Sequence, residues 1–329
     1  MTAKRISWGI MGCGNMAQSF CRDLILSDHA VIAAACSRKM SSARALADQF
    51  DIAVVTDDFE AMLSAPDIDI IYIATPHTEH HSQSLQALRA GKHVLCEKPM
   101  ALNQRQAREI INLAREKRLF FMEALWTRFF PALKKVRTLI NQGAIGAPRR
   151  LTADFGYAMA FDPTSRVFNP DLAGGALLDV GIYPLALSRF LFGAPLSLTG
   201  EARIGPSGID ETNSLHLRHE KDVLSQLASA VTVETPQEAV IMGELGRITI
   251  AREWWRPDRF RLTQNDGAEE EFSFPLKGQG YLYEIEAVEK CLQTNITECP
   301  DMPHAESLGL LQNMDQLRQQ WKLYYPGDS

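Results

Sequence analysis

The sequence predicts an α/β protein of two parts: a doubly wound parallel sheet, then an α+β part with a large open, mostly antiparallel sheet. In residues 1–123, short apolar runs alternate with helical stretches, as in a parallel sheet covered by helices on both faces. From Leu198 to Phe274, apolar residues recur at every second position between Gly, Pro and Asp, which is typical of antiparallel strands. A chain of 329 residues suits two cores better than one. We therefore expect one domain in residues 1–123 and another in residues 124–329.

The first part opens with a strand, a turn and a helix. The apolar run Ile6–Ile10 leads into Gly-Cys-Gly at positions 12–14, and the helical run Met16–Ile25 follows. With Ala17 this is a GxGxxA pattern, in which the glycines allow a tight turn and a close approach of the backbone to a pyrophosphate. A second strand, Val31–Cys36, supplies the expected context, so the sequence predicts a Rossmann dinucleotide-binding domain. The residues expected at the cofactor in this loop are Gly12, Gly14, Asn15 and Met16.

The residues after the second strand indicate which dinucleotide binds. A carboxylate at this place would bond the 2′-hydroxyl of NAD and repel the 2′-phosphate of NADP. The chain has Ser37 and Arg38 instead, a hydroxyl and a guanidinium that suit a phosphate. The alternative is that Ser37 caps a helix and Arg38 is a solvated loop charge. We expect NADP(H) to be preferred over NAD(H).

Polar residues follow two later strands of the same sheet. Further elements are expected at Asp69–Ala74, Ser82–Ala90, His93–Cys96, Gln104–Glu116 and Leu119–Glu123. Ligands of such sheets bind beyond the carboxyl ends of the strands. The cofactor residues expected at these strand ends are Thr75, His77, His80, Glu97 and Lys98. His77 is expected to border the nicotinamide, whereas His80 either does the same or caps the following helix.

Lys98 is the most informative of these residues. It directly follows a buried strand, and Pro99 stiffens the turn that orients it. A partly desolvated amine near a cationic nicotinamide has a lowered pKa, and it can bond a substrate hydroxyl or change the acidity of a nearby phenol. The alternative is a surface lysine paired with Glu97.

In the second part, the segment Gly174–Tyr183 (GGALLDVGIY) carries the remaining chemistry. It is expected to open a helix, so that Asp179 and Tyr183, four residues apart, lie on one helical face. An aromatic connector, Glu123–Pro131, precedes it. The helix Leu133–Gln142 and a strand at Arg149–Phe155 lie between, and Leu282–Gln293 and Ala305–Trp321 are expected to be closing helices. The antiparallel strands are expected at Leu198–Ile204, Thr212–His219, Val223–Thr232, Glu238–Met242, Gly246–Ala251, Arg259–Leu262 and Glu270–Phe274.

Composition excludes several classes of protein. A net charge of −6 without a basic stripe disfavours a general nucleic-acid binder. The six cysteines contain no CxxC pair, which suits a reducing cytosol. No apolar run approaches membrane-spanning length, and the early first strand leaves no room for a signal sequence. We expect a cytoplasmic protein with no membrane or nucleic-acid partner. We expect no metal either, since no further cluster of ligand residues lies near His77 and His80 in the sequence.

Four motifs, the GxGxxA loop, Thr75-Pro76-His77, Glu97-Lys98-Pro99 and GGALLDVGIY, resemble the Gfo/Idh/MocA oxidoreductase family along essentially the whole chain. Tyr183 stands where most members carry His, which looks like the branch of dimeric dihydrodiol dehydrogenase and NADP-dependent D-xylose dehydrogenase. The resemblance implies that Lys98 and Tyr183 are the catalytic pair, that Asp179 supports them, and that a homodimer forms through the C-terminal sheet. We expect the face of that sheet away from its helices to be apolar enough to pair with a copy of itself. The substrate-binding residues that it implies are Trp126, Phe155, Asp179 and one of Trp254 and Trp255, of which Trp254 is our choice.

The expected reaction moves a hydride between NADP(H) and a secondary alcohol or hemiacetal hydroxyl of a neutral cyclic small molecule, such as a sugar, polyol or trans-dihydrodiol. Tyr183 is expected to be the acid/base, with Lys98 favouring its phenolate. Asp179 then either orients Lys98 or binds a second substrate hydroxyl. Two alternatives stay open: a catalytically silent NADP(H) sensor, and an enzyme that uses tightly bound cofactor for a transient oxidation.

Overall fold

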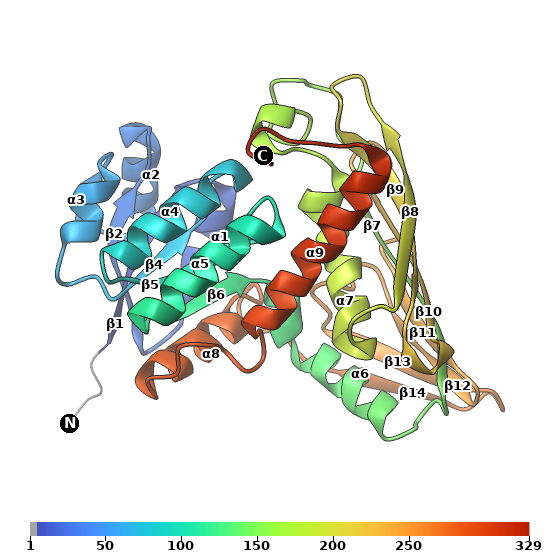
Figure 1. Cartoon of the computed structure of the whole chain (residues 1–329). Coiled ribbons are helices and arrows are strands. Elements are labelled where there is room, and N and C mark those ends of the chain that lie inside the picture. Colours follow the sequence, from blue (N-terminus) through green and yellow to red (C-terminus); the bar gives the residue numbers. More distant parts are fainter. Residues whose placement is uncertain (1–4, 329) are drawn as a thin grey trace. The chain divides into compact units, whose positions relative to one another are not determined.

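The computed structural model describes residues 5–328, which divide into two compact units (Figure 1). Unit 1 comprises the described residues up to Trp126 together with Leu276–Leu308. Unit 2 comprises Thr127–Pro275 and the described residues from Gly309 onward. The α/β class predicted from the sequence, with one parallel and one mostly antiparallel sheet, is confirmed.

Unit 1 is built on a six-stranded sheet in the order β3-β2-β1-β4-β5-β6, in which all neighbours are parallel. Its strands are β1 (Ile6–Met11), β2 (Ala30–Cys36), β3 (Val54–Thr56), β4 (Ile70–Ile73), β5 (His93–Glu97) and β6 (Phe121–Ala124). Its helices are α1 (Asn15–Leu24), α2 (Met40–Phe50), α3 (Phe59–Ser64), α4 (His77–Arg89), α5 (Gln104–Lys117) and α8 (Leu282–Gln293). The strand order reverses between β1 and β4, which is where doubly wound sheets bind their ligands.

The division into units differs from the sequence-based domains at residues 276–308, which we had placed in the second domain. Helix α8 packs against α1 within unit 1. The carboxylate of Asp23 in α1 accepts the backbone N–H groups of Gln279 and Leu282, and Ser27 donates to Glu289 of α8 at 2.7 Å. These contacts join residues more than 250 positions apart, so no local sequence pattern announces them.

Unit 2 is built on an eight-stranded sheet in the order β14-β13-β12-β11-β7-β10-β9-β8. Only the β7 and β10 pair is parallel. The strands are β7 (Pro148–Gly156), β8 (Ser197–Ile204), β9 (Asp210–Arg218), β10 (Leu224–Ala230), β11 (Ala239–Gly243), β12 (Gly246–Ile250), β13 (Arg259–Gln264) and β14 (Glu269–Ser273). Seven of these lie close to where the alternating pattern places them.

The helices of unit 2 include α6 (Pro131–Asn141), the π-helix η3 (Leu177–Gly181) and α7 (Ile182–Phe192). Short 3₁₀ turns lie at η1 (Trp126–Phe129), η2 (Pro170–Leu172) and η4 (Glu220–Asp222), and α9 (His304–Trp321) runs from unit 1 into unit 2. Helix α7 packs on the central strands β7 and β10. It therefore covers the middle of one face of the sheet.

The stretch Pro170–Phe192 corrects one sequence-based statement. By length and composition it is apolar enough to cross a membrane, although we expected no such run. In the structure 89% of its most apolar window is buried within the fold. A core helix passes the same test, and α7 is such a helix, since its residues from Ile182 to Leu191 are all buried.

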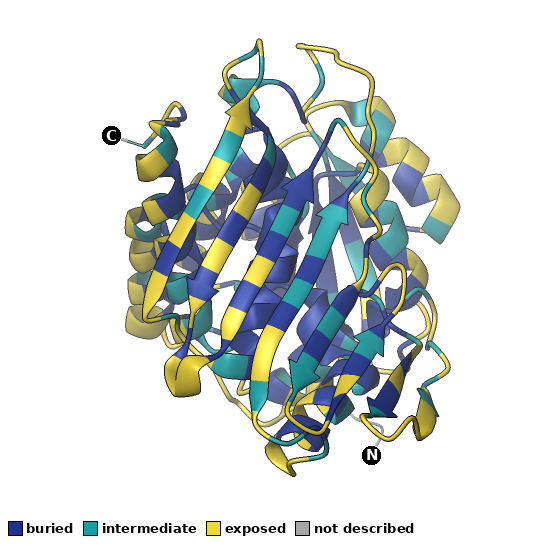
Figure 2. Cartoon of the chain, turned by 90° about the vertical axis from the view of Figure 1, so that its right-hand side faces the viewer, coloured by how far each residue is buried: buried dark blue, intermediate teal, exposed yellow. Residues whose placement is uncertain are grey.

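The other face of the eight-stranded sheet is uncovered, and Figure 2 shows it with exposed and buried residues alternating along the strands. We expected this face to be apolar, and that expectation is wrong. Its exposed side chains are mainly polar or charged, and they include Glu201, Arg203, His216, Arg218, Gln226, Arg247, Arg259 and Arg261. Solvent-facing strand positions tolerate such residues because only the opposite face packs on helices.

Candidate functional site

The glycine loop of unit 1 connects β1 to α1 as the GxGxxA pattern predicts. Gly12 has a φ of +88°, and a Cβ there would lie 2.7 Å from the carbonyl oxygen of Ala74, so no larger residue fits. Gly14 is exposed, and a Cβ added to it would meet no described atom within 4 Å. Asn15 and Met16, also exposed, form the first turn of α1. An open helix N-terminus behind a tight glycine turn fits a dinucleotide pyrophosphate.

The end of β2 carries the two residues expected to select the cofactor. Ser37 is half-buried and its backbone N–H donates to the carbonyl oxygen of Thr56. The side chain of Arg38 is exposed. A guanidinium in this position is accessible to a phosphate group bound at the edge of the sheet.

His80 contacts two strand-end loops, and its expected role at the cofactor stays a prediction. Its ring is fully buried in α4, with Nδ1 2.7 Å from the carbonyl oxygen of Pro99 and Nε2 2.8 Å from that of Thr75. Carbonyl oxygens only accept, so the ring is the donor in any hydrogen bond that it forms with them. The hydroxyl of Thr75 donates to Gln83 at 2.7 Å. His77, in the first turn of α4, is buried with its ring 5.8 Å from that of His80.

Glu97 lies beneath the loop that carries Lys98. Its carboxylate accepts the hydroxyl of Tyr72 at 2.6 Å and the backbone N–H of Lys98 at 3.2 Å. Burial raises the pKa of Glu97, against the opposing effects of the Tyr72 bond and the Lys98 charge. Glu97 is thus a buried support of the loop, and its expected contact with a cofactor stays a prediction. The side chain of Lys98 is half-buried.

Trp126, expected to bind substrate, is the last residue of the first segment of unit 1. Its ring stacks on that of Tyr281 with centroids 4.3 Å apart, and it is 8% exposed. The Tyr281 ring also lies edge-on to Phe20, so Trp126 belongs to an aromatic cluster. This stacking fixes the plane of the indole ring.

In unit 2, Asp179 lies in the π-helix η3 and Tyr183 in the first turn of α7. We expected one regular helix, and the structure has a π-helical turn at this place instead. The carboxylate of Asp179 accepts the hydroxyl of Tyr157 at 2.5 Å and the guanidinium of Arg166 at 3.1 Å. π-helical turns inside helices are frequent at functional sites.

Tyr157 and Arg166 are site residues that the sequence analysis missed. Burial and then the negative charge of Asp179 raise the pKa of Tyr157 above its usual value, so Tyr157 remains a phenol that donates to the carboxylate. This leaves Tyr183 as the better candidate for a proton acceptor. A carboxylate such as Asp179, close to an expected catalytic tyrosine, indicates that hydrogen-bond donors should surround it. No motif in the sequence identifies Tyr157 and Arg166 as those donors.

Aromatic rings adjoin Tyr183 on the face of the sheet covered by α7. The ring of Phe155, at the end of β7, lies 5.5 Å from the Tyr183 ring and stacks on Trp255 at 3.5 Å. Trp254, our choice from the sequence, has no exposed surface and donates its indole N–H to the carbonyl of Asp154 at 2.7 Å. Trp254 is therefore a core residue, and Trp255 is the tryptophan that adjoins Phe155.

Asp210, at the start of β9, supports the first turn of η3. Its Oδ2 accepts the backbone N–H of Leu177 at 2.8 Å and the amide of Asn213 at 2.9 Å. Within residues 5–328, its Oδ1 has no hydrogen-bond partner. Burial raises the pKa of Asp210 from 3.8 to about 7, against the bonds from Asn213 and Leu177 and the charge of Arg318.

This raised pKa makes folding stability depend on pH. Between pH 3.8 and about 7 the folded protein keeps a proton on Asp210 that the unfolded chain has lost. The proton stabilises the folded state, so the contribution of Asp210 falls as the pH rises through this range and is constant above it. Asp210→Asn removes the titration, so the Tm of the variant minus that of the wild type should increase from pH 5 to 7 and then level off. A difference that does not change with pH would contradict the assignment.

Among residues 5–328, no group of three or more His, Cys, Asp or Glu side chains is arranged to hold a metal ion.

Proteins similar to this chain are oxidoreductases. Residues 6–125 match an oxidoreductase family with an NAD-binding Rossmann fold, and residues 133–249 match the Gfo/Idh/MocA C-terminal domain. A trans-1,2-dihydrobenzene-1,2-diol dehydrogenase of Mus musculus is 34% identical over 98% of this chain and 99% of its own length. A D-xylose 1-dehydrogenase (NADP(+)) of Hypocrea jecorina is 30% identical over 98% of this chain and 93% of its own.

Solved structures agree with these relatives. A 3-ketoreductase from Actinomadura kijaniata, in complex with NADP and TDP-benzene, is 26% identical with a TM-score of 0.88, over 96% of this chain and 98% of its own. An aldose-aldose oxidoreductase from Caulobacter crescentus, 23% identical with a TM-score of 0.88 over 97% of this chain and 98% of its own, shares the fold. The motifs of the sequence and both matched domains thus agree, and the chain belongs to the Gfo/Idh/MocA family of oxidoreductases.

Proposed function

We propose that this protein is an NADP(H)-dependent oxidoreductase that acts on a secondary alcohol or hemiacetal hydroxyl of a neutral cyclic substrate. The observation that carries the proposal is the group of residues around Tyr183. The stacked rings of Phe155 and Trp255 lie beside Tyr183, and Asp179, four residues earlier, accepts a hydrogen bond from Tyr157. A flat apolar surface suits the face of a ring, and a carboxylate accepts a hydroxyl of that ring. The names of the two dehydrogenase relatives, for a cyclic diol and for a sugar, support this class of substrate.

Within the proposal, the glycine loop of unit 1 holds the cofactor. Gly12, Gly14 and the first turn of α1 bind the pyrophosphate, and Arg38 binds the 2′-phosphate. The bound nicotinamide supplies the hydride acceptor or donor. The name of the xylose dehydrogenase and the cofactor in the ketoreductase structure support NADP over NAD.

Arg38→Ala tests the choice of cofactor. Losing a charge-assisted hydrogen bond should weaken NADP⁺ binding by about 10- to 100-fold and change NAD⁺ binding little. The dissociation constants of both cofactors, measured by quenching of protein fluorescence, check this. Arg22→Ala, at the far end of α1, is a control that should change neither. Equal losses for the two cofactors in the Arg38 variant would remove the proposed phosphate contact.

Tyr183 is the proposed acid/base and Lys98 its proposed helper. A free phenol has a pKa near ~10, so it accepts a proton poorly near neutral pH. A cation nearby favours the phenolate, and the ammonium of Lys98 is the proposed cation. As the hydride leaves the substrate carbon, Tyr183 takes the hydroxyl proton, and in the reverse direction it returns that proton.

Asp179 is proposed to accept a second substrate hydroxyl. Both of its oxygens already take hydrogen bonds, from Tyr157 and Arg166, and each oxygen has a further lone pair. The partly exposed Arg166 is a cation that we did not expect near the substrate. Because Asp179 balances its charge, the pair is neutral overall, and a neutral substrate is retained in the proposal.

We also propose a cytoplasmic homodimer that forms through the uncovered face of the sheet in unit 2. All six cysteines are buried and unbridged, which suits a reducing compartment. Since the face is polar, its contacts would be hydrogen bonds and ion pairs more than apolar packing. Sedimentation equilibrium of the wild type and of an Arg218→Glu variant tests the dimer.

The proposed function is tested by following absorbance at the reduced-nicotinamide band with NADP⁺ and NAD⁺. The panel contains pentoses, hexoses, polyols and trans-dihydrodiols. Turnover of one class with NADP⁺ preferred supports the proposal. Cofactor binding without turnover of any compound would favour a sensor, and cofactor that survives gel filtration would favour an enzyme with a tightly bound cofactor.

A further inference from the structure

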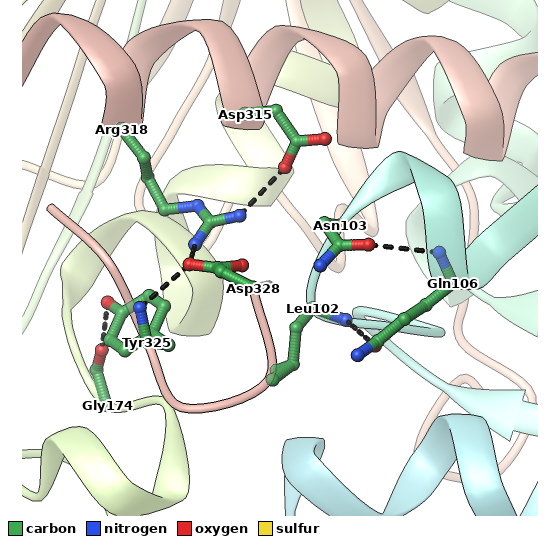
Figure 3. A network of polar contacts seen from close by, with 8 residues as sticks. All are labelled: Leu102, Asn103, Gln106, Gly174, Asp315, Arg318, Tyr325 and Asp328. Atoms are coloured by element: carbon green, nitrogen blue, oxygen red, sulfur yellow. Dashed lines mark hydrogen bonds and ion pairs between the residues drawn. The ribbon is translucent and has the colours of Figure 1, made fainter.

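The segment that follows α9 folds back onto the start of the GGALLDVGIY segment within unit 2. The hydroxyl of Tyr325 donates to the carbonyl oxygen of Gly174 at 2.5 Å (Figure 3). Tyr325 is 4% exposed, so this hydrogen bond is shielded from water. Gly174 lies three residues before the π-helix η3, which contains Asp179.

Tyr325 is itself held firmly in place. Figure 3 shows Arg318 of α9 between two carboxylates, Asp315 at 2.8 Å and Asp328 at 2.6 Å. The same oxygen of Asp328 accepts the backbone N–H of Tyr325 at 2.7 Å, and the Arg318 guanidinium lies 5.2 Å from the Tyr325 ring centre. Arg318 is 4% exposed, so the ion pairs are largely shielded from solvent. The phenol of Tyr325 is therefore presented to Gly174 from a fixed position.

The next residue, Gly175, lies between Tyr325 and Asp210. Its φ is +117°, and a Cβ there would come within 3.0 Å of both Asp210 Oδ1 and the Tyr325 hydroxyl. Asp210 also accepts the N–H of Leu177, as described above. Residues 174–177 thus make two hydrogen bonds to side chains outside the segment. The carbonyl of Gly174 accepts one from Tyr325, and the N–H of Leu177 donates the other to Asp210.

Such support matters because a π-helical turn is rare and less favourable than an α-helical one. The backbone N–H of Asp179 bonds the carbonyl of Gly175 at 3.3 Å, which is long for such a hydrogen bond. External bonds at Gly174 and Leu177 fix where the turn begins. The direction of Asp179, and of Tyr183 one turn later, follows from that starting point.

We propose that Tyr325 is a positioning residue for the reaction: through its bond to Gly174 it sets the placement of the π-helix that carries Asp179 and leads to Tyr183. This inference rests on the proposed function for its effect on turnover, but its structural part does not. The hydroxyl of Tyr325 acts on the backbone and touches neither substrate nor cofactor.

The test compares Tyr325→Phe with Tyr324→Phe, which removes the hydroxyl of the adjacent, 65% exposed tyrosine. Leaving the buried carbonyl of Gly174 without its donor should reduce kcat about tenfold per NADPH-binding site, with the dissociation constant of NADPH unchanged. Tyr324→Phe should match the wild type in both quantities. A purely structural role would lower Tm and the fraction of folded enzyme but leave kcat per binding site intact, which would overturn the proposal.

A second readout needs no turnover. Backbone amide hydrogen exchange in residues 174–183 should be faster in Tyr325→Phe than in the wild type and Tyr324→Phe, while exchange in β12 and β13 is unchanged. Equal exchange in residues 174–183 in all three proteins would overturn the inference even if the enzyme proves inactive on every substrate. If exchange changes as expected but the wild type turns nothing over, the proposed function fails and the structural support by Tyr325 stands.

Discussion

Tyr183→Phe is expected to lower kcat by about 10²- to 10⁴-fold, the usual loss when a general acid/base is removed. The variant keeps the aromatic ring that packs 5.5 Å from Phe155, so the fold and the aromatic surface should survive. The glycine loop belongs to unit 1 and is unchanged, so the dissociation constant of NADPH should stay within about twofold of the wild type. Steady-state kinetics and a fluorescence titration with NADPH measure the two quantities.

Tyr157→Phe is the matched comparison for this prediction, because it removes a hydroxyl bonded to the same carboxylate of Asp179. Since the raised pKa of Tyr157 keeps it a phenol, it should not serve as the base. We expect this variant to lose far less kcat than Tyr183→Phe and to show mainly a higher KM. A larger loss in Tyr157→Phe would exchange the roles of the two tyrosines.

Lys98→Met is expected to lower kcat by about 10²- to 10³-fold, as for the loss of one electrostatic contact to the reacting groups. Without the ammonium, the phenol of Tyr183 should ionise at higher pH, so the pH at which kcat rises should move upward. Methionine keeps the length and the apolar part of the side chain. The pH dependence of kcat between pH 6 and 10 measures the shift.

Lys117→Met, at the exposed end of α5, removes the same charge elsewhere in unit 1 and should change neither kcat nor its pH profile. If Lys98→Met lowers kcat without moving the profile, Lys98 does not act on Tyr183. If Lys98→Met weakens only NADPH binding, the role of Lys98 is limited to binding the cofactor.

The fold could be predicted from the sequence wherever one local pattern sufficed. The GxGxxA loop requires Gly12, since a Cβ would clash with the Ala74 carbonyl. Strands β9 to β13 alternate buried residues with more exposed ones, which leaves a period of two in the sequence. By contrast, α8 joins unit 1 through bonds to Asp23 and Ser27, and a contact across such a sequence distance has no local signature.

The candidate site could be predicted only in part. Lys98, Asp179 and Tyr183 stand in motifs, whereas Tyr157 and Arg166 come from a strand end and a loop with no repeating pattern. His80 and Glu97 stand in motifs as well, but burial directs their polar atoms to Thr75, Pro99 and Tyr72. The sequence also does not distinguish the adjacent residues Trp254 and Trp255. Only the packing against β7 decides that Trp255 is the one that adjoins Phe155.

In the proposed reaction, a hydride moves between the nicotinamide and a carbon of the substrate. NADPH labelled with deuterium at the transferring position of C4, incubated with the carbonyl form of the compound that the panel identifies, tests it most directly. One deuterium is expected at the new carbinol carbon of the product, seen by mass spectrometry and NMR, and nearly none with Tyr183→Phe in the same time. Product formed at the wild-type rate without deuterium, or equally fast labelling by Tyr183→Phe, would contradict it.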